Sequence, residues 1–244
     1  MKDAFGDRIK RYESVTTDQK FIPRLPVIVR IDGKSFHSYT RGLDRPFDVG
    51  FMDAMIRTAM DVAEESCAVM AYTQSDEITL ILYSDDHEKQ IYFDGKVHKI
   101  VSTLAGLASA KFNQYMGRQK LGWFDCRAFQ VPTLMEAVNV LIWRESDAAK
   151  NSIQMVARAH YSPKELAYKK IPDLHEMLYQ KGINWNDLTP AEKRGTYILK
   201  RPVQINGTIR RKYMRVYLPQ LSTISNQVDV IFNAIVPITP DPVF

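Results

Sequence analysis

The sequence predicts an α+β fold in which an antiparallel sheet carries two helices on one face. Short apolar runs typical of strands alternate with two long segments of helical period. Their order is strand, helix, strand, strand, helix, strand, which is the order of the split β-α-β (ferredoxin-like) arrangement. In that arrangement the first strand lies beside the hairpin of the second and third, and both helices pack on the same face.

The elements of the first half follow from these periods. A charged, periodic segment at the start of the chain predicts a short helix. The apolar run Val-Ile-Val-Arg-Ile predicts the first strand, and apolar residues that recur near every 3.6 positions predict the two long helices. The predicted elements are a helix at 2–14, a strand at 27–31, a polar loop at 32–46, a helix at 47–66, strands at 68–73 and 78–83, a polar connection at 85–95, a helix at 97–116 and a strand at 123–131.

The second half is predicted to be mainly helical, followed by a hairpin. Pro132 suits the start of a helix, and a helical pattern with breaks continues to about residue 160. Short helices are expected at 163–170 and 174–180. Residues 195–218 then form a basic ribbon around Asn206-Gly207, a favoured hairpin turn.

Composition indicates a folded protein with no membrane partner. Of 244 residues, 45% are hydrophobic and 25% charged, enough for a large core in one domain or in two closely packed ones. The net charge of +5 permits a nucleic-acid partner without requiring one. The sequence shows no signal-peptide core and no run of membrane-spanning length, so we expect a cytoplasmic protein.

The chain has two cysteines, Cys67 and Cys126, and no C-x-x-C pair. A thiolate metal site is therefore not expected. Both cysteines lie among apolar residues in the sequence, and we expect both to be buried thiols.

Two acidic clusters stand where predicted strands end. Asp32-Gly33 follows the first strand, and Ser75-Asp76-Glu77 lies in the hairpin turn. Each cluster alone is typical of a polar turn, but the predicted sheet makes them neighbours at one end, as in the palm of nucleotide polymerases and cyclic-dinucleotide synthases. Two carboxylates so placed can hold a pair of Mg²⁺ ions for nucleotidyl transfer. Asp32, Asp76 and Glu77 are the candidate catalytic residues. Asp32 and Asp76 are the candidate metal ligands, and Glu77, which faces the other way unless the turn twists it, is a candidate supporting group.

The loop after the first strand is a candidate phosphate cradle. Gly33, Lys34, Ser35, Phe36 and His37 can present backbone N–H groups to phosphates. Lys34 and His37 are candidate phosphate contacts, with simple solvent exposure as the alternative. A P-loop is excluded because it requires glycine at position 28, which is Ile28.

Basic residues mark two candidate RNA surfaces. Lys99 lies on the second long helix and could belong to a phosphate-binding stripe or to a solvated helix face. Arg210 and Arg211 lie on the basic ribbon, which could bind RNA, stay solvated or form a subunit contact.

The segments Arg-Ile-Asp-Gly-Lys-Ser-Phe-His at 30–37 and Tyr-Thr-Gln-Ser-Asp-Glu at 72–77 resemble the signature segments of the tRNA-His guanylyltransferase superfamily. Further similarity lies at 124–127, 143–148 and 193–196. The resemblance implies a palm-like fold and 3′-to-5′ addition of nucleotides to the 5′ end of tRNA. It also implies ATP and GTP as substrates and, in many members, a homotetramer.

The resemblance further implies roles for particular residues. Two Mg²⁺ ions would be held by Asp32, Asp76 and the backbone carbonyl of Gly33. The expected nucleotide-binding residues are Gly33, Lys34, Ser35, Phe36, His37, Ser75 and Lys99, the last in place of a typical arginine. The expected RNA-binding residues are Asn151, Lys193 and Arg194, with Arg210 and Arg211 added because the ribbon that carries them is basic, not because of the resemblance.

One departure points to a particular branch of the superfamily. Residues 149–155 keep only Asn151 and Ile153 close to the His-Ile-Asn-Asn-Leu-Tyr-Asn segment of the eukaryotic branch. The chain therefore resembles the bacterial and archaeal branch, whose members fill in missing 5′ nucleotides against a template. We expect one catalytic domain over 1–244, with a palm core at about 24–135 and an extension at about 136–244. The alternatives are a palm-type nucleotide cyclase and a catalytically inactive RNA-binding protein.

Overall fold

The computed structural model describes residues 3–205 and 208–233 of the chain. Within them six strands form one antiparallel sheet in the order β4-β1-β3-β2-β5-β6. The strands are β1 (Val27–Gly33), β2 (Met70–Gln74), β3 (Glu77–Leu82), β4 (Phe124–Gln130), β5 (Thr196–Ile205) and β6 (Thr208–Val216). The order β4-β1-β3-β2 is that of the split β-α-β arrangement, which confirms the predicted fold class.

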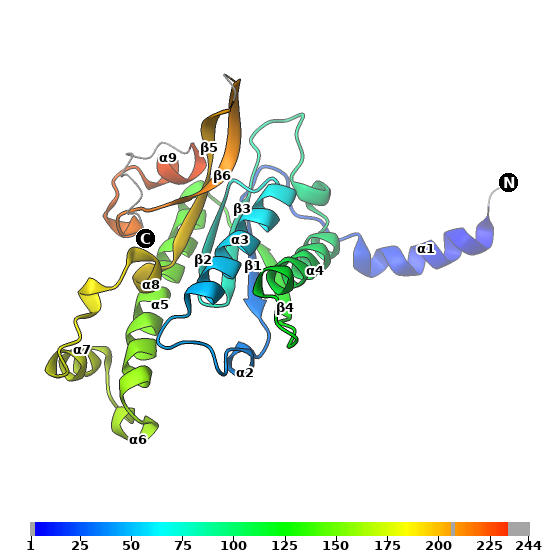
Figure 1. Ribbon diagram of the computed structural model, residues 1–244. Helices are drawn as coiled ribbons and strands as arrows, with labels where there is room; N and C mark the ends of the chain where they lie inside the picture. The colour runs from blue at the N-terminus through cyan, green and yellow to red at the C-terminus, as the bar shows by residue number, and fades with distance from the viewer. Residues whose placement is uncertain (1–2, 206–207, 234–244) are drawn as a thin grey trace.

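Several helices pack against this sheet (Figure 1). The α-helices are α1 (Ala4–Thr17), α2 (Phe36–Tyr39), α3 (Val49–Glu65), α4 (Val97–Met116), α5 (Leu134–His160), α6 (Pro163–Leu166), α7 (Ile171–Gln180), α8 (Pro190–Arg194) and α9 (Gln227–Phe232). Of these, α1, α6 and α7 lie away from the sheet. Single 3-10 turns lie at Tyr92–Gly95, Trp185–Asp187 and Leu221–Thr223.

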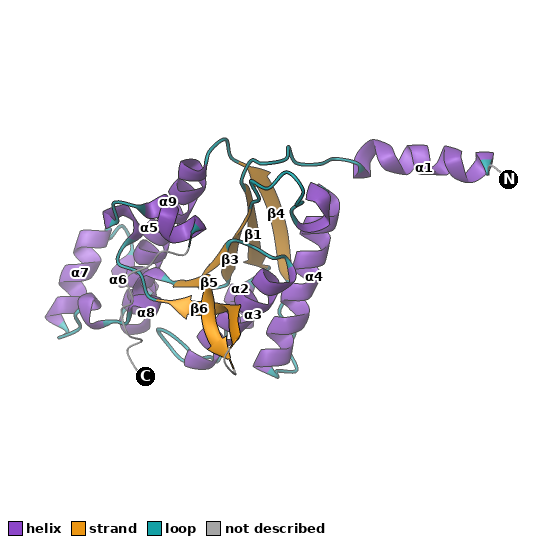
Figure 2. Ribbon diagram, turned by 90° about the horizontal axis from the view of Figure 1, so that it is seen from above, coloured by secondary structure: helices purple, strands orange, loops and turns teal. Residues whose placement is uncertain are grey.

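The sheet lies between two helical layers. Figure 2 shows α3 and α4 on one side and α5 with α9 on the other. Alternate residues of β1 serve the two sides: Val29 and Ile31 pack into the core with α3 and α4, whereas Ile28 packs into the core with α5 and α9. The two long helices α3 and α4 cover one face, as predicted, and α5 and α9 cover much of the other.

The basic hairpin of β5 and β6 continues the palm sheet instead of forming a separate body. Met70 to Thr73 of β2 pair with Leu199 to Thr196 of β5. The sheet therefore crosses the expected boundary near residue 136, and the division into a core and an extension stays a prediction. The expected Asn206-Gly207 turn lies outside the described residues.

The expected breaks between residues 132 and 160 are wrong, because α5 is one continuous helix of 27 residues. The Thr133 side chain caps it, with its hydroxyl oxygen accepting from the Glu136 N–H at 3.1 Å. Its first half packs on the sheet, and its second half packs on α7 through a separate apolar cluster. The apolar stripe changes direction between these two surfaces, and buried Arg144 and Glu145 interrupt it. Because of these changes the apolar residues do not follow one continuous 3.6-residue period, and the sequence predicted breaks that the helix does not have.

Two further expectations need correction. Residues 32–46 are not only a polar loop, since α2 buries Phe36 against the rings of Phe51, Phe112 and Phe124. Cys67 is exposed, not buried, because it follows the end of α3 in a left-handed turn with φ of 50°. Cys126 is half-buried on β4, where burial raises the pKa of its thiol to about 12.

Helix α1 stands apart from the rest of the molecule (Figures 1 and 2). None of the residues Ala4–Thr17 is buried. No helix within residues 3–205 and 208–233 is both long and apolar enough to cross a membrane.

Candidate active site

The two acidic clusters meet at the end of the sheet nearest α2 (Figure 1). Asp32 lies directly opposite Glu77 in the pairing of β1 with β3. The Gly33 N–H donates to the Asp76 carbonyl oxygen at 3.0 Å, which ties the end of β1 to the β2–β3 turn. The sequence expectation that strand pairing makes the clusters neighbours therefore holds in the structure.

Two backbone features make this close approach possible. A Cβ atom added at Gly33 would lie 2.8 Å from the Asp76 carboxylate oxygen and 2.5 Å from the Phe36 ring, so only glycine fits there. Ser75 adopts a left-handed conformation with φ of 49°. Such a conformation costs a non-glycine residue about 1–3 kcal/mol and is characteristic of functional turns.

The electrostatics of Asp76 fit a cation-binding group. Burial raises the pKa of Asp76, and the negative charge of Asp32 adds to this, while the Ser75 hydroxyl, donating at 3.1 Å, lowers it. Asp32 has a basic neighbour, Arg127, whose Nη2 lies 3.6 Å from its carboxylate oxygen. In the described part of the chain no basic side chain forms such an ion pair with Asp76. A bound cation would relieve the repulsion between the two carboxylates.

The donor set suits Mg²⁺ only if backbone and substrate oxygens complete it. Residues 3–205 and 208–233 contain no group of three or more His, Cys, Asp or Glu side chains placed to hold a metal ion. Two carboxylates and the Gly33 carbonyl are hard oxygen donors of the kind Mg²⁺ takes, and Mg²⁺ usually keeps waters and phosphate oxygens as its other ligands. The residues present therefore fit the ion.

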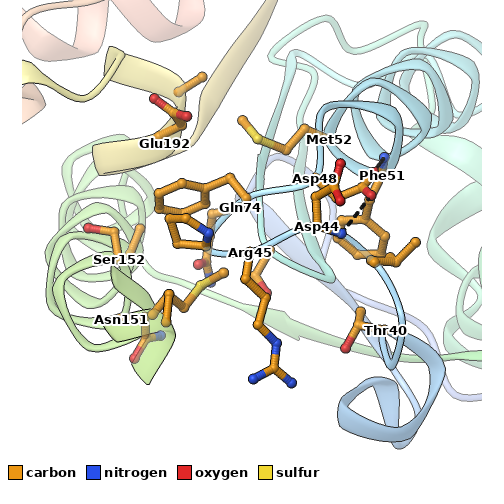
Figure 3. Close-up of a pocket in the computed structure, with 18 of the residues that line it drawn as sticks. Thr40, Asp44, Arg45, Asp48, Phe51, Met52, Gln74, Asn151, Ser152 and Glu192 are labelled. Carbon is orange, nitrogen blue, oxygen red and sulfur yellow. Dashed lines mark hydrogen bonds between the residues drawn. The ribbon is translucent and has the colours of Figure 1, made fainter. Parts of the chain in front are cut away.

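Asp32 and Asp76 form an acidic pair. A pocket of about 330 Å³, shown in Figure 3, has Gln74 and Ser75, the two residues before Asp76, in its wall. Its walls come from the segment between α2 and α3, from the β2–β3 turn and from α5 and α8. Ser75 lines it while also contacting Asp76, so the pocket and the acidic pair form one site. The basic side chains on its wall are His37, Arg45 and Arg158. The wall also carries Asp44, Asp48 and Glu192. A largely apolar pocket with a few polar and charged groups suits a nucleotide whose base enters it.

Comparisons with known proteins agree with the family resemblance seen in the sequence. The family model described as tRNAHis guanylyltransferase matches residues 6–132. A bacterial tRNA(His) guanylyltransferase (Thg1)-like protein in complex with ATP has a TM-score of 0.85 and 38% identity, over 94% of this chain and 99% of that one. The chain belongs to the tRNAHis guanylyltransferase family.

Two further relatives agree with this assignment. A bacterial Thg1-like protein in complex with GTP has a TM-score of 0.79 and 39% identity, over 90% of this chain and 94% of that one. The probable tRNA(His) guanylyltransferase of Dictyostelium discoideum is 30% identical over 73% of this chain and 76% of its own. The resemblance seen in the sequence is confirmed, and the protein is a nucleotidyltransferase.

Glu77 takes a different place in this guanylyltransferase-family site from Asp76. Its carboxylate accepts two hydrogen bonds from Arg144 of α5, both at 2.7 Å, and both side chains are 8% exposed. Burial raises the pKa of Glu77, and the Arg144 guanidinium opposes that rise. The two successive carboxylates thus point to different partners, as strand alternation predicts. The supporting role expected of Glu77 stays a prediction.

The nucleotide-binding candidates divide into two groups. His37 and Ser75 line the pocket, and Gly33 lies at the acidic pair. Lys34 and Ser35 are exposed beside them, and the Phe36 side chain is occupied in the core, so only its backbone is left for a ligand.

Lys99 lies away from the acidic pair. Ser109 of α4 accepts a hydrogen bond from the Phe124 N–H, and Phe124 pairs with Gly33. Lys99 precedes Ser109 by about 15 Å of helix and stacks near the Phe93 ring. The structure therefore does not bring Lys99 to this site, and its expected role stays a prediction.

The RNA-binding candidates are also spread out. Asn151 lines the pocket. The Arg194 Nε lies 3.5 Å from Glu145, and the Lys193 amine donates to the Asn186 carbonyl, so both stabilise the α8 region. Arg210 and Arg211 are exposed on β6, far along the ribbon.

Three arginines lie near the carboxylates. Arg30 and Arg144 have no role in the sequence interpretation, and for Arg127 the sequence leaves open whether it faces the site or pairs with Asp125. Arg127 pairs with both Asp32 and Asp125, and Arg144 pairs with Glu77. Arg30 lies two residues before Asp32, with its Nε 3.8 Å from Glu77. In the sequence, Arg30 and Arg127 could have been found from the alternation of arginine and aspartate along β1 and β4, which places opposite charges on one face of the sheet.

Proposed function

We propose that this protein adds nucleotides in the 3′-to-5′ direction to the 5′ end of tRNA against a template, as a 5′-end repair enzyme. The observation that carries the proposal is that Asp32 and Asp76 lie close enough for the charge of one to raise the pKa of the other, while Ser75, which donates to Asp76, lines the adjoining pocket. Solved relatives with ATP or GTP bound, 38% and 39% identical to this chain, support nucleoside triphosphates as its substrates.

The reaction has two displacements at phosphorus. First, a 5′-phosphate oxygen of the RNA attacks the α-phosphate of ATP or GTP, and pyrophosphate leaves. Then the 3′-hydroxyl of an incoming nucleotide attacks the activated 5′ phosphate, losing its proton, and the nucleoside monophosphate of the activator leaves. Both steps depend mainly on positioning and on neutralising phosphate charge.

The residues of this chain have definable parts in that reaction. Asp32, Asp76 and the Gly33 carbonyl would hold two Mg²⁺ ions, which supply charge neutralisation and make a hydroxyl easier to deprotonate. His37, Arg45 and the backbone N–H groups that follow Lys34 hold triphosphate oxygens, since the Lys34 N–H itself donates to the Trp123 carbonyl oxygen. The buried ion pair of Glu77 with Arg144 keeps β3 and α5 fixed behind the carboxylates.

The decisive experiment is extension of tRNAs that lack one or more 5′ nucleotides. We expect addition opposite a template nucleotide in the presence of Mg²⁺ and ATP or GTP, and little addition beyond the last template position. Incubation with nucleoside triphosphates alone serves as the control and should give no cyclic product. Extension that ignores the template, or product formed without RNA, would contradict the proposal.

The ribbon of β5 and β6 is our proposed contact to the body of the tRNA. Thr196 of β5 pairs with Thr73 near the site, whereas Val203 pairs with Arg210 about 23 Å further along. A tRNA whose 5′ end lies at the acidic pair must extend tens of ångströms to reach these arginines, which a folded tRNA does.

Reversing both ribbon charges, Arg210→Glu with Arg211→Glu, should weaken tRNA binding and flatten its dependence on salt. Removing two phosphate contacts lowers the slope of log Kd against log salt by about two. Filter binding over a salt series measures this, with the double reversal Lys164→Glu and Lys169→Glu near α6 as the matched control. Unchanged affinity and slope would remove the ribbon from the RNA surface.

The homotetramer expected from the resemblance stays a proposal. Light scattering of the purified protein tests it directly, and a single species of about four chain masses is the expected result.

A further inference from the structure

A half-exposed tryptophan stands next to the acidic pair. Trp143 of α5 is 53% exposed, far more than a large aromatic side chain at a helix–sheet contact needs to be. The guanidinium carbon of Arg144 lies 4.6 Å from its ring centroid, and that of Arg30 lies 5.6 Å away. An open indole ring is thus held between the sheet and the helix by two cations.

The groups that hold this ring are themselves fixed. Arg144 is bonded twice to Glu77 and once to Asp147, whose carboxylate oxygen lies at 3.1 Å. Arg30 is only 18% exposed and sits 3.8 Å from the same Glu77. The position of the ring is therefore set before any ligand arrives, which lowers the entropic cost of binding to it.

The ring lies within one nucleotide of the reacting groups. Arg30 and Asp32 are two residues apart on the same face of β1, a separation of about 7 Å along the strand. That face is uncovered near the edge of the sheet, where the Asp125 and Arg127 side chains of β4 are 57% and 51% exposed. A chain end with its 5′ phosphate at Asp32 and Asp76 has room to lay its base on Trp143.

We propose that Trp143 stacks on the base of the 5′-terminal nucleotide of the RNA and so positions its 5′ phosphate at the acidic pair. Base–aromatic stacking tolerates every base, because every base presents a flat π-face. An enzyme that extends ends of varying sequence needs such a contact, since hydrogen bonds to base edges would restrict it to one nucleotide. This inference rests on the proposed function, and Trp143 acts as a positioning residue, not as a catalytic one.

The test uses an RNA whose 5′-terminal nucleotide is 2-aminopurine, a base whose fluorescence falls when it is stacked. Binding to the wild-type protein should quench this fluorescence without any catalysis. Trp143→Ala should remove the quenching and raise KM for RNA about tenfold, with kcat within about twofold. Trp143→Phe should keep most of the quenching, whereas Trp143→Leu, which has apolar bulk but no ring, should lose it.

Three controls separate stacking from other roles. Thermal unfolding of each variant shows whether the fold is intact, and Tyr179→Ala removes an exposed aromatic side chain from α7, far from the site, and should change nothing. Light scattering identifies a subunit contact, because an interface residue would change the oligomer size and leave the quenching as it was.

The outcomes are distinct. Quenching and KM that stay at wild-type values in folded Trp143→Ala, or an altered oligomer with normal quenching, overturn the stacking proposal. Either result leaves the proposed function standing, provided that the wild type still extends truncated tRNA. A wild-type protein that does not extend tRNA defeats the proposed function, while the fluorescence measurement still reports on stacking.

Discussion

Replacement of Asp76 by asparagine should abolish both chemical stages, lowering each rate by at least about a thousandfold. Asparagine keeps the shape of the side chain and its contact with the Ser75 hydroxyl but removes the negative charge. Charge stabilisation by a bound ion contributes several kcal/mol, and each 1.36 kcal/mol corresponds to a tenfold rate change. Single-turnover formation of the activated 5′ end, followed by nucleotide addition, measures the two stages separately.

The same variant should fold at least as well as the wild type. In the folded protein burial and the charge of Asp32 raise the pKa of Asp76, so folding favours its protonated form. The group therefore adds stability below its unfolded pKa of about 4, and this stability is lost as pH rises through the higher folded value. Without Mg²⁺, Asp76→Asn should unfold at a higher temperature than the wild type near pH 7, and the difference should vanish below about pH 4.

Asp53→Asn on the exposed surface of α3 is the matched control and should keep full activity. If Asp76→Asn still extended truncated tRNA at a rate near that of the wild type, Asp76 would not hold the ion. If the variant were inactive only because it unfolds, the melting curves would show it.

Replacement of Arg144 by methionine should destabilise the protein by about 3–5 kcal/mol. The substitution leaves the Glu77 carboxylate buried with no bidentate partner, and breaking a buried ion pair from one side costs this much. Urea unfolding followed by circular dichroism gives the change in the free energy of unfolding. A loss of less than about 1 kcal/mol in the free energy of unfolding would contradict this prediction. It would mean that in the variant the Glu77 carboxylate is hydrated or pairs with another cation.

The double variant Glu77→Gln with Arg144→Met tests what this ion pair does. It removes both charges together, so most of the lost stability should return. A stable double variant with near wild-type rates would make Glu77 purely structural. A stable but inactive one would show that the pair positions the reacting groups, since neither side chain reaches the pocket wall.

The acidic pair was predictable because it depends on local signals. Strand period and turn residues fix where β1, β2 and β3 end, and antiparallel pairing then brings Asp32 to the Ser75-Asp76 turn. The pocket was only partly predictable. His37 and Ser75 lie close in sequence to the motifs, whereas Arg158 reaches the pocket because α5 continues unbroken past the sheet.

By itself the sequence determined the first four strands, the two long helices between them and the positions of the carboxylates, because periods of two and 3.6 residues are properties of neighbouring positions. That β5 and β6 extend the same sheet was visible only in the structure. Only the tertiary structure decided the partners of the carboxylates. Arg144 is 67 residues from Glu77 and meets it because α5 crosses the second face of the sheet, where a buried carboxylate requires a countercharge. The same crossing placed Trp143 beside Arg30 and left its indole ring exposed. On the opposite face, packing against Phe51 of α3 and Phe112 of α4 moved the Phe36 side chain from the phosphate loop into the core.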